Sequence, residues 1–296
     1  MATTYTHIAQ NKWRSLFILA IFISFVLGIA YVFAAAYHLY WLFPFAILFV
    51  SFQGVASYWW SDKLVLGISG AKEVNKNENL DLYRIVENEA ITAGLPTPRI
   101  YIIEDSAPNA FATGRDPKHA VIAVTRGLLG KLNKPELEGV IAHEFSHIGN
   151  YDIRLQTMVV VLVGIVVLLS DWFLRISIFG GDDNNDNQWL VIVGLILAIL
   201  SPIFAYLLQL SLSRNREFLA DADGALLTRN PEGLASALEK ITADKEPLEA
   251  ANKATAHLYF ANPLKDHEGK RAMFSGLFDT HPDPAERIRR LREMAM

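Results

Sequence analysis

The chain contains no cysteine, which excludes disulfide bonds, thiolate metal ligands and cysteine nucleophiles. It is also poor in charge: only 20% of its 296 residues are charged, whereas 52% are hydrophobic. The formal net charge is −4, so the overall charge gives no reason to expect nucleic acid as a partner. This balance is typical of a membrane protein rather than of a soluble enzyme.

Four long apolar segments predict how the chain meets a bilayer. Residues 16–36 and 40–60 are each long enough to cross a hydrocarbon core about 30 Å thick. A second apolar run follows the first at once, which excludes a cleaved signal peptide before a soluble domain. Residues 155–179 are a third apolar segment, interrupted by two charged residues near its far end, and residues 189–212 are the fourth.

The basic residues beside these segments predict the orientation. If all four segments span the membrane, the flanking lysines and arginines fall on one side, which the positive-inside rule makes cytoplasmic. These residues are Lys12, Arg14, Lys63, Lys72, Arg154, Arg214 and Arg216.

The polar stretch between the second and third apolar segments predicts a small soluble structure. Residues 79–93 have helical spacing, and residues 100–103 and 121–124 are strand candidates. Between the strands lies a run of small residues that forms either a plain loop or an edge strand able to bind an extended substrate backbone. That run covers residues 109–114, and the residues expected to bind substrate are Asn109, Ala110, Phe111 and Ala112.

The motif His143-Glu144-Phe145-Ser146-His147 has the pattern H-E-x-x-H. Two histidines four residues apart on a helix lie about 40° apart around its axis, so both imidazoles can bind one metal ion, and Zn²⁺ binds nitrogen readily. Glu144 can reach a water on that ion without being a ligand. The pattern predicts that the metal acidifies the water, that Glu144 takes its proton, and that hydroxide attacks a peptide carbonyl.

The alternative is a surface helix that carries these residues by coincidence. The sequence favours a buried helix instead, because an apolar stripe runs along it and Asn133 and Glu136 are typical of a helix start. Buried polar groups need partners, and a metal ion would supply one.

A catalytic zinc normally has three protein ligands and one open position. Asn150 and Ile153 stand where the metzincin continuation needs Gly and His, so that class is excluded. Glu217 is the best remaining candidate, because a hairpin of the last two spans brings its segment next to the H-E-x-x-H helix. Asp221, one turn later, can accept the other N–H of a ligand imidazole. An exposed helix of mixed charge is the alternative for this stretch.

The C-terminal region predicts two further helices. Residues 231–241 have helical spacing, and Asp283 with Pro284 is typical of a helix start. The basic residues that follow, beginning with Arg287, are expected on a solvated face or against anionic lipid.

Several motifs together resemble those of the HtpX family of bacterial integral-membrane zinc metallopeptidases, gluzincins related to the CAAX prenyl-proteases. The resemblance extends across essentially the whole chain. It is carried by the H-E-x-x-H motif with Asn150 and Asp152, by residues 109–114, by R-x-x-E-x-x-A-D at residues 214–221, and by His281-Pro282 followed by Arg287-Ile288.

This resemblance implies one Zn²⁺ per chain, held by His143, His147 and Glu217, with Glu144 as the catalytic base. It implies an enzyme of the bacterial inner membrane that cleaves misfolded or damaged membrane proteins on the cytoplasmic side, in a response to stress. Its partners would be protein substrates and the lipid bilayer, and a homo-oligomer is compatible with it. His281 would approach the active site and stabilise the oxyanion, as Arg214 could also do; otherwise His281 is a packed or capping residue.

The expected fold is a mainly α membrane protein with a small β-sheet, in which a transmembrane hairpin splits a gluzincin-like metallopeptidase domain. Residues 1–60 and 155–212 form the two hairpins, and residues 61–154 and 213–296 form the two cytoplasmic catalytic segments. Two other functions remain open. A catalytically silent metal-binding scaffold would not need Glu144, and a prenyl-protein processing protease would be expected to have more spans.

Overall fold

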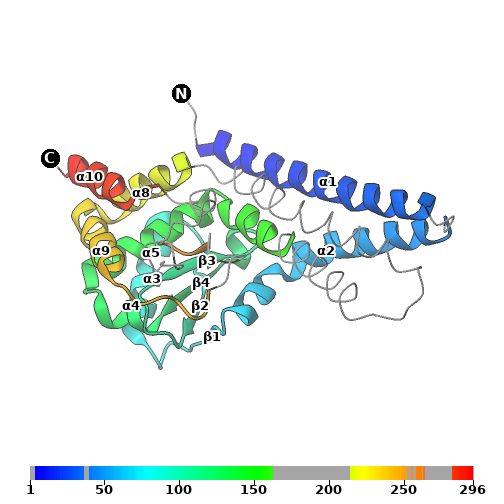
Figure 1. The fold of residues 1–296 in the computed structure, drawn as a ribbon. Helices are drawn as coiled ribbons and strands as arrows, with labels where there is room; N and C mark the ends of the chain where they lie inside the picture. The colour runs from blue at the N-terminus through cyan, green and yellow to red at the C-terminus, as the bar shows by residue number, and fades with distance from the viewer. Residues whose placement is uncertain are drawn as a thin grey trace.

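The computed structural model describes residues 4–36, 40–162, 214–251, 255, 258–261, 263 and 282–295. Figure 1 shows a compact part that carries the sheet and most helices, from which two long helices project side by side. The elements are α1 (Thr4–Ala36), α2 (Leu42–Ile68), β1 (Lys72–Glu73), α3 (Leu80–Ala93), β2 (Arg99–Ile103), β3 (Ala110–Thr113), η1 (Pro117–His119), β4 (Val121–Thr125), α4 (Arg126–Lys131), α5 (Lys134–Gly149), α8 (Arg214–Thr228), α9 (Pro231–Ala243) and α10 (Pro284–Met294).

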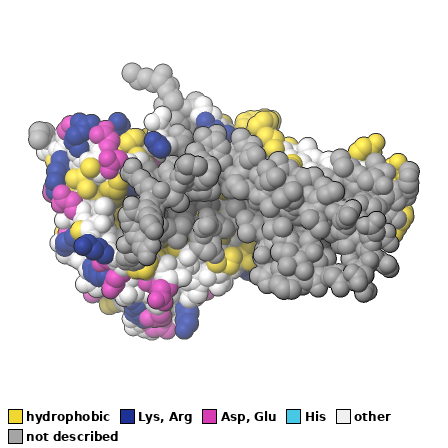
Figure 2. All heavy atoms as spheres, viewed as in Figure 1, with side chains coloured by type: hydrophobic (Ala, Val, Ile, Leu, Met, Phe, Trp, Pro, Cys, Tyr) yellow, Lys and Arg dark blue, Asp and Glu magenta, His cyan; other side chains and the backbone are white. Residues whose placement is uncertain are grey.

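The projecting helices α1 and α2 contain the first two predicted spans. Within the described residues, one stretch, Ala9–Gly28 of α1, is long and apolar enough to cross a membrane, and α2 has a shorter apolar stretch at Phe43–Ala56. Large apolar side chains of α2, such as Phe45 and Leu48, are exposed. In Figure 2, charged side chains gather on the compact part, whereas apolar side chains appear at the far end of the projecting helices.

The other two predicted spans are only partly described. Residues 152–162 are helical, and residues 163–213 lie outside the described part of the chain. Ile18 and Phe22 of α1 pack against Leu155, Val159 and Leu162 of this helical stretch. The start of the third apolar segment therefore lies against α1, while the two hairpins and the four-part division of the chain stay predictions.

The sheet has four strands in the order β1-β2-β4-β3. β2 and β4 are parallel, with Arg99 opposite Val121, and the two outer pairs are antiparallel. The prediction of a mainly helical chain with a small sheet is therefore confirmed. The residues between the strand candidates form β3 at one edge of the sheet, rather than a loop.

Successive side chains of a strand point to opposite faces of a sheet. Every residue of β4 is buried, so both faces of the sheet are covered. Ile100 and Ile122 belong to the core that contains Phe145 of α5. Ile103 and Val121 belong to a second core with Val65 at the end of α2. The sheet thus lies between the end of α2 and the helix α5, which carries the H-E-x-x-H motif.

The buried carboxyl of Glu89 in α3 predicts how stability depends on pH. Burial, together with the charge of Glu138, raises the pKa of Glu89 to about 7. As the pH rises from the ordinary carboxyl pKa to about 7, the unfolded chain loses a proton that the folded protein keeps, so the free energy of unfolding falls. Glu89→Gln should remove this decrease, which chemical denaturation in detergent at pH values below and above this range would measure.

The matched control is Glu87→Gln, which removes a carboxylate from the solvent-facing side of the same helix, where it pairs with Lys76. This control should keep the loss of stability that the wild-type protein shows as the pH rises from acidic values to about 7. If Glu89→Gln keeps it too, the carboxyl of Glu89 is not the group responsible.

Candidate metal centre

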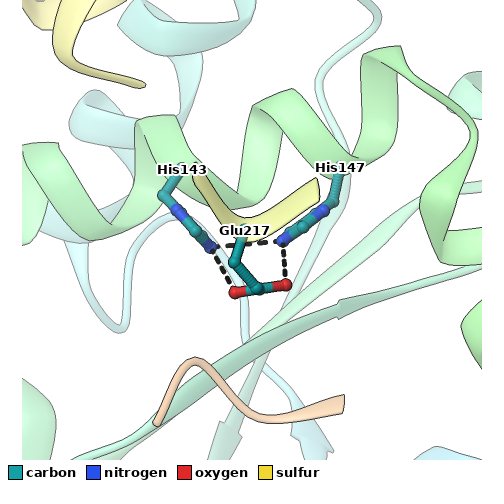
Figure 3. A group of neighbouring side chains, drawn as sticks. All are labelled: His143, His147 and Glu217. Atoms are coloured by element: carbon teal, nitrogen blue, oxygen red, sulfur yellow. Dashed lines mark hydrogen bonds and ion pairs between the residues drawn. The ribbon is translucent and has the colours of Figure 1, made fainter. Parts of the chain in front are cut away.

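The H-E-x-x-H motif lies in α5, whose start is fixed by a full capping box. The side chain of Asn133 accepts a hydrogen bond from the Glu136 N–H, and the Glu136 carboxylate accepts one from the Asn133 N–H. The helix is buried along most of its length, and His143 and His147 are 0% and 4% exposed. Their rings point from the same side of α5 toward the carboxylate of Glu217, as Figure 3 shows.

Glu217 comes from α8, which packs directly against α5. A side chain on Gly224 would place its Cβ 3.0 Å from the backbone nitrogen of His143. A side chain here would force the two backbones apart by a few tenths of an ångström, so glycine favours this close approach of the two helices. The approach brings Glu217 to the imidazoles although residues 150–213 separate α8 from α5 in the sequence.

The three side chains fit a metal ion such as zinc. The Nε2 atoms of His143 and His147 are 3.2 Å apart, and the Glu217 oxygens lie 3.7 Å from the first and 3.5 Å from the second. Tetrahedral bonds of about 2.0–2.1 Å would place ligand atoms roughly 3.3 Å apart. Two imidazoles and one carboxylate are also a ligand set that catalytic zinc sites use.

Each imidazole has a carboxylate at its other nitrogen. Nδ1 of His143 lies 3.0 Å from Asp221, and Nδ1 of His147 lies 3.1 Å from Asp152. Such contacts hold the tautomer that leaves Nε2 free to bind a metal. The position that the sequence predicted for Asp221 is therefore the one observed, although its role stays a prediction.

The carboxylates shape the charge of the site. Burial lowers the pKa of His143 to about 4, even though Asp221 opposes this shift. Burial also disfavours protonated His147, but the hydrogen bond to Asp152 and the charge of Glu217 outweigh it and raise the pKa of His147 to about 9. The surroundings of His147 thus favour a positive charge, which an ion between the rings would supply.

Glu144 lies in the same buried region. Burial raises the pKa of Glu144 to about 7; Glu217 adds to the rise, while His147 and a hydrogen bond from the Ala112 N–H oppose it. A carboxyl with a pKa near neutrality suits a group that takes and returns a proton. The hydrogen bond from Ala112 also places Glu144 next to β3, the strand predicted from the sequence to bind substrate.

The edge of β3 is partly occupied. The Phe260 N–H donates a hydrogen bond of 2.8 Å to the Ala110 carbonyl. The Asn109 amide donates to the Ala261 carbonyl at 2.9 Å. Ala112 lies next to Glu144 on this edge, because its N–H donates a hydrogen bond to the Glu144 carboxylate.

Arg287 was missed by the sequence analysis, which expected it on a solvated helix face. It is 2% exposed and donates to both oxygens of Asp221, at 2.7 and 2.8 Å. One guanidinium nitrogen also lies 3.7 Å from Glu217. Arg287 therefore balances the negative charge of Asp221 and Glu217. In the sequence, only the Arg287-Ile288 pair of the family resemblance points to this residue.

Asn11 of α1 was also missed. Its side-chain amide donates to Asp152 at 2.7 Å and to the Asn150 carbonyl at 2.9 Å. Arg216 contacts the same oxygen of Asp152 at 3.3 Å. The helix that contains the candidate membrane span thus contacts the carboxylate beside His147, and no local sequence pattern around Asn11 indicates this.

Of the two candidates for oxyanion stabilisation, the structure describes Arg214. Arg214 is exposed at the first residue of α8. His281 lies outside the described residues, so its role stays a prediction.

Comparison with known proteins identifies the family. The model of peptidase family M48 matches residues 76–295. The chain belongs to this family. It is 47% identical over 294 residues to a protease HtpX homolog of Dictyoglomus turgidum, covering 99% of this chain and 95% of the relative. It is 45% identical to a protease HtpX homolog of Tropheryma whipplei, covering 98% of both chains.

A solved structure, that of Ste24p from S. mikatae, is 20% identical, with a TM-score of 0.49 over 94% of this chain and 66% of that chain. The M48 family and the relatives confirm the predicted resemblance and activity: the chain is a membrane-associated M48 metallopeptidase that acts on protein substrates.

Removing the carboxylate behind His147 should weaken metal binding. Asp152→Ala leaves Nδ1 of His147 without its partner, and losses of this kind typically lower metal affinity by about 10–100-fold. Competition with a fluorescent zinc chelator measures the affinity of the purified protein. Asp223→Ala is the matched control, because Asp223 contacts Ser146 of α5 but neither imidazole; equal losses in the two variants would contradict the assigned role of Asp152.

Asn11→Ala should lower zinc affinity several-fold, less than Asp152→Ala, because it releases Asp152 without removing it. Lys12→Ala is the control: Lys12 also joins α1 to this turn, through the ring of Tyr151 4.3 Å away, but does not contact Asp152. The same chelator titration applies. Lost affinity in the Lys12 variant alone would show that the docking of α1, rather than the amide of Asn11, matters.

Proposed function

We propose that this chain is a membrane-embedded zinc endopeptidase in which His143, His147 and Glu217 hold the ion and Glu144 transfers protons. The observation that carries this proposal is the convergence of two Nε2 atoms and a carboxylate from separate helices, with all ligand atoms within 4.8 Å of one another. A zinc ion in this place would supply Lewis acidity for water and for the substrate carbonyl.

The chain's own residues would prepare the reaction in three ways. Asp152 and Asp221 orient the imidazoles, and Arg287 balances the negative charge around them. Burial raises the pKa of the Glu144 carboxyl to about 7. The group can therefore take a proton from the attacking water and deliver it to the leaving amine. The buried surroundings also limit competing bulk water.

An extended substrate would bind along β3. Alternate residues of a strand direct their backbone groups to the same side, so the Ala112 carbonyl points outward next to Glu144. Asn109, Ala110 and Phe111 continue this edge, with the 258–261 segment already paired at Ala110. Substrate backbone would therefore add to the sheet around Ala112, next to Glu144.

The substrates we propose are misfolded or damaged membrane proteins, cleaved on the cytoplasmic side of a bacterial plasma membrane. The names of the HtpX relatives support a protease, and the exposed apolar faces of α1 and α2 support insertion in a bilayer. The basic residues at the compact end of α2 and at the start of α1 support the cytoplasmic orientation. We assign oxyanion stabilisation to His281. Arg214 is the weaker candidate, because its side chain is exposed.

Glu144→Gln tests the proton-transfer role. This change keeps the shape of the side chain but removes the base, so proteolysis should fall by at least about 10²–10⁴-fold while zinc stays bound. The assay compares wild type and variant on an unfolded membrane protein and on a prenylated peptide, and metal content is measured in parallel.

Glu138→Gln serves as the control, because it changes a carboxylate of α5 that faces away from the ligands. Cleavage of the prenylated peptide alone would favour the prenyl-protein processing function. A wild-type protein that holds zinc but cleaves neither substrate would favour the silent scaffold.

A further inference from the structure

A polar cavity separate from the metal centre lies where α2 meets the sheet. It has a volume of about 420 Å³, and its lining includes Trp59, Lys63, Arg99, Arg115 and Lys118. It shares no lining residue with the metal centre. Cavities of this size are typical of small-ligand sites.

The cavity carries an excess of positive charge. Asp62 is the carboxylate in its lining, where Arg99 contacts it at 3.3 Å, and Arg115 lies 3.8 Å from the neighbouring Asp116. For Lys63 and Lys118, both exposed, the described part of the chain provides no carboxylate within ion-pair distance. These two ammonium groups are therefore available to an anion, and the two guanidinium groups lie beside them.

The loop between β3 and β4 is built to place its cations here. Gly114 has a φ of 138°, and a Cβ on it would lie 2.5 Å from the His119 carbonyl oxygen. Only glycine allows the chain to fold back so tightly. The Arg115 guanidinium stacks over the ring of Trp59, 4.6 Å from its centre, which ties the loop to α2.

The position along α2 identifies the ligand. Exposed apolar side chains lie along α2 from Phe45 onward, and Trp59 and Trp60 among them are 48% and 50% exposed; Leu64 and Ile68, farther along the helix, are also exposed. Tryptophan in a membrane protein concentrates at the interface with water. Lys63 follows Trp59 by one helical turn on the same face. The cavity therefore opens at the depth of lipid headgroups.

We propose that this cavity binds the phosphate headgroup of an anionic phospholipid, whose acyl chains lie along the apolar face of α2. Lys63 and Lys118 contact the phosphate, Arg99 and Arg115 add positive charge, and Trp59 and Trp60 pack at the glycerol level. The proposal rests on the membrane insertion of α2 that belongs to the proposed function, but lipid binding is measured without any proteolysis. A free phosphate ion offers the same chemistry and is distinguished by the test.

The full-length protein in nanodiscs of phosphatidylcholine and phosphatidylglycerol tests this proposal. Native mass spectrometry after release from the nanodisc counts the retained lipids. Wild type should retain phosphatidylglycerol over phosphatidylcholine. Lys63→Gln with Arg115→Gln and Lys118→Gln should weaken this retention by about 100-fold, since each cation near an anionic surface contributes roughly fivefold.

The matched control replaces three exposed cations elsewhere, Arg84, Lys134 and Lys245, by glutamine, and it should retain phosphatidylglycerol like wild type. An equal loss in the control, or equal retention of the neutral lipid, would overturn the proposal. Displacement of the lipid by millimolar inorganic phosphate would reassign the cavity to a free anion.

Unchanged zinc affinity shows that the triple variant is folded. If it loses zinc, the single variants Lys63→Gln and Lys118→Gln replace it, because both side chains are exposed. Each is expected to lower retention about fivefold, and no loss in either would contradict the proposal.

Discussion

Helices α5 and α8 pack so closely that the H-E-x-x-H histidines and Glu217 form one group. Gly224 lets the backbone of α8 lie against His143, and this contact puts the Glu217 carboxylate in front of two imidazoles. Buried carboxylates are costly unless they are paired. Asp221 and Glu217 both lie within ion-pair distance of Arg287, which offsets their negative charge.

The apolar helices also take part in the centre. Asn11 of α1 fixes Asp152 behind His147, and the end of α2 packs under one face of the sheet whose edge strand touches Glu144. The orientation of a ligand ring therefore depends on how a helix outside the peptidase domain docks. This arrangement connects the candidate metal centre to the helix that contains the candidate membrane span.

The local elements and the histidine pair could be predicted from sequence, because they depend on short-range chemistry. Helical spacing at residues 79–93 corresponds to α3, and Asn133 with Glu136 marks the start of α5. Glu217 was found by combining the required third ligand with the expected hairpin. Arg287 and Asn11 could not be found in this way, because an arginine on a basic helix and an asparagine in an apolar helix acquire their partners only through tertiary packing. The pairing along the edge of β3 likewise depends on where residues 258–261 lie.

X-ray absorption at the zinc edge of the purified wild-type protein and of Glu217→Ala tests whether α8 supplies the third ligand. The proposed centre predicts one zinc per chain with two imidazole ligands and a carboxylate oxygen in wild type, and a strong loss of affinity in the variant. A zinc environment and affinity that do not change when Glu217 is removed would contradict the claim that α8 completes the site.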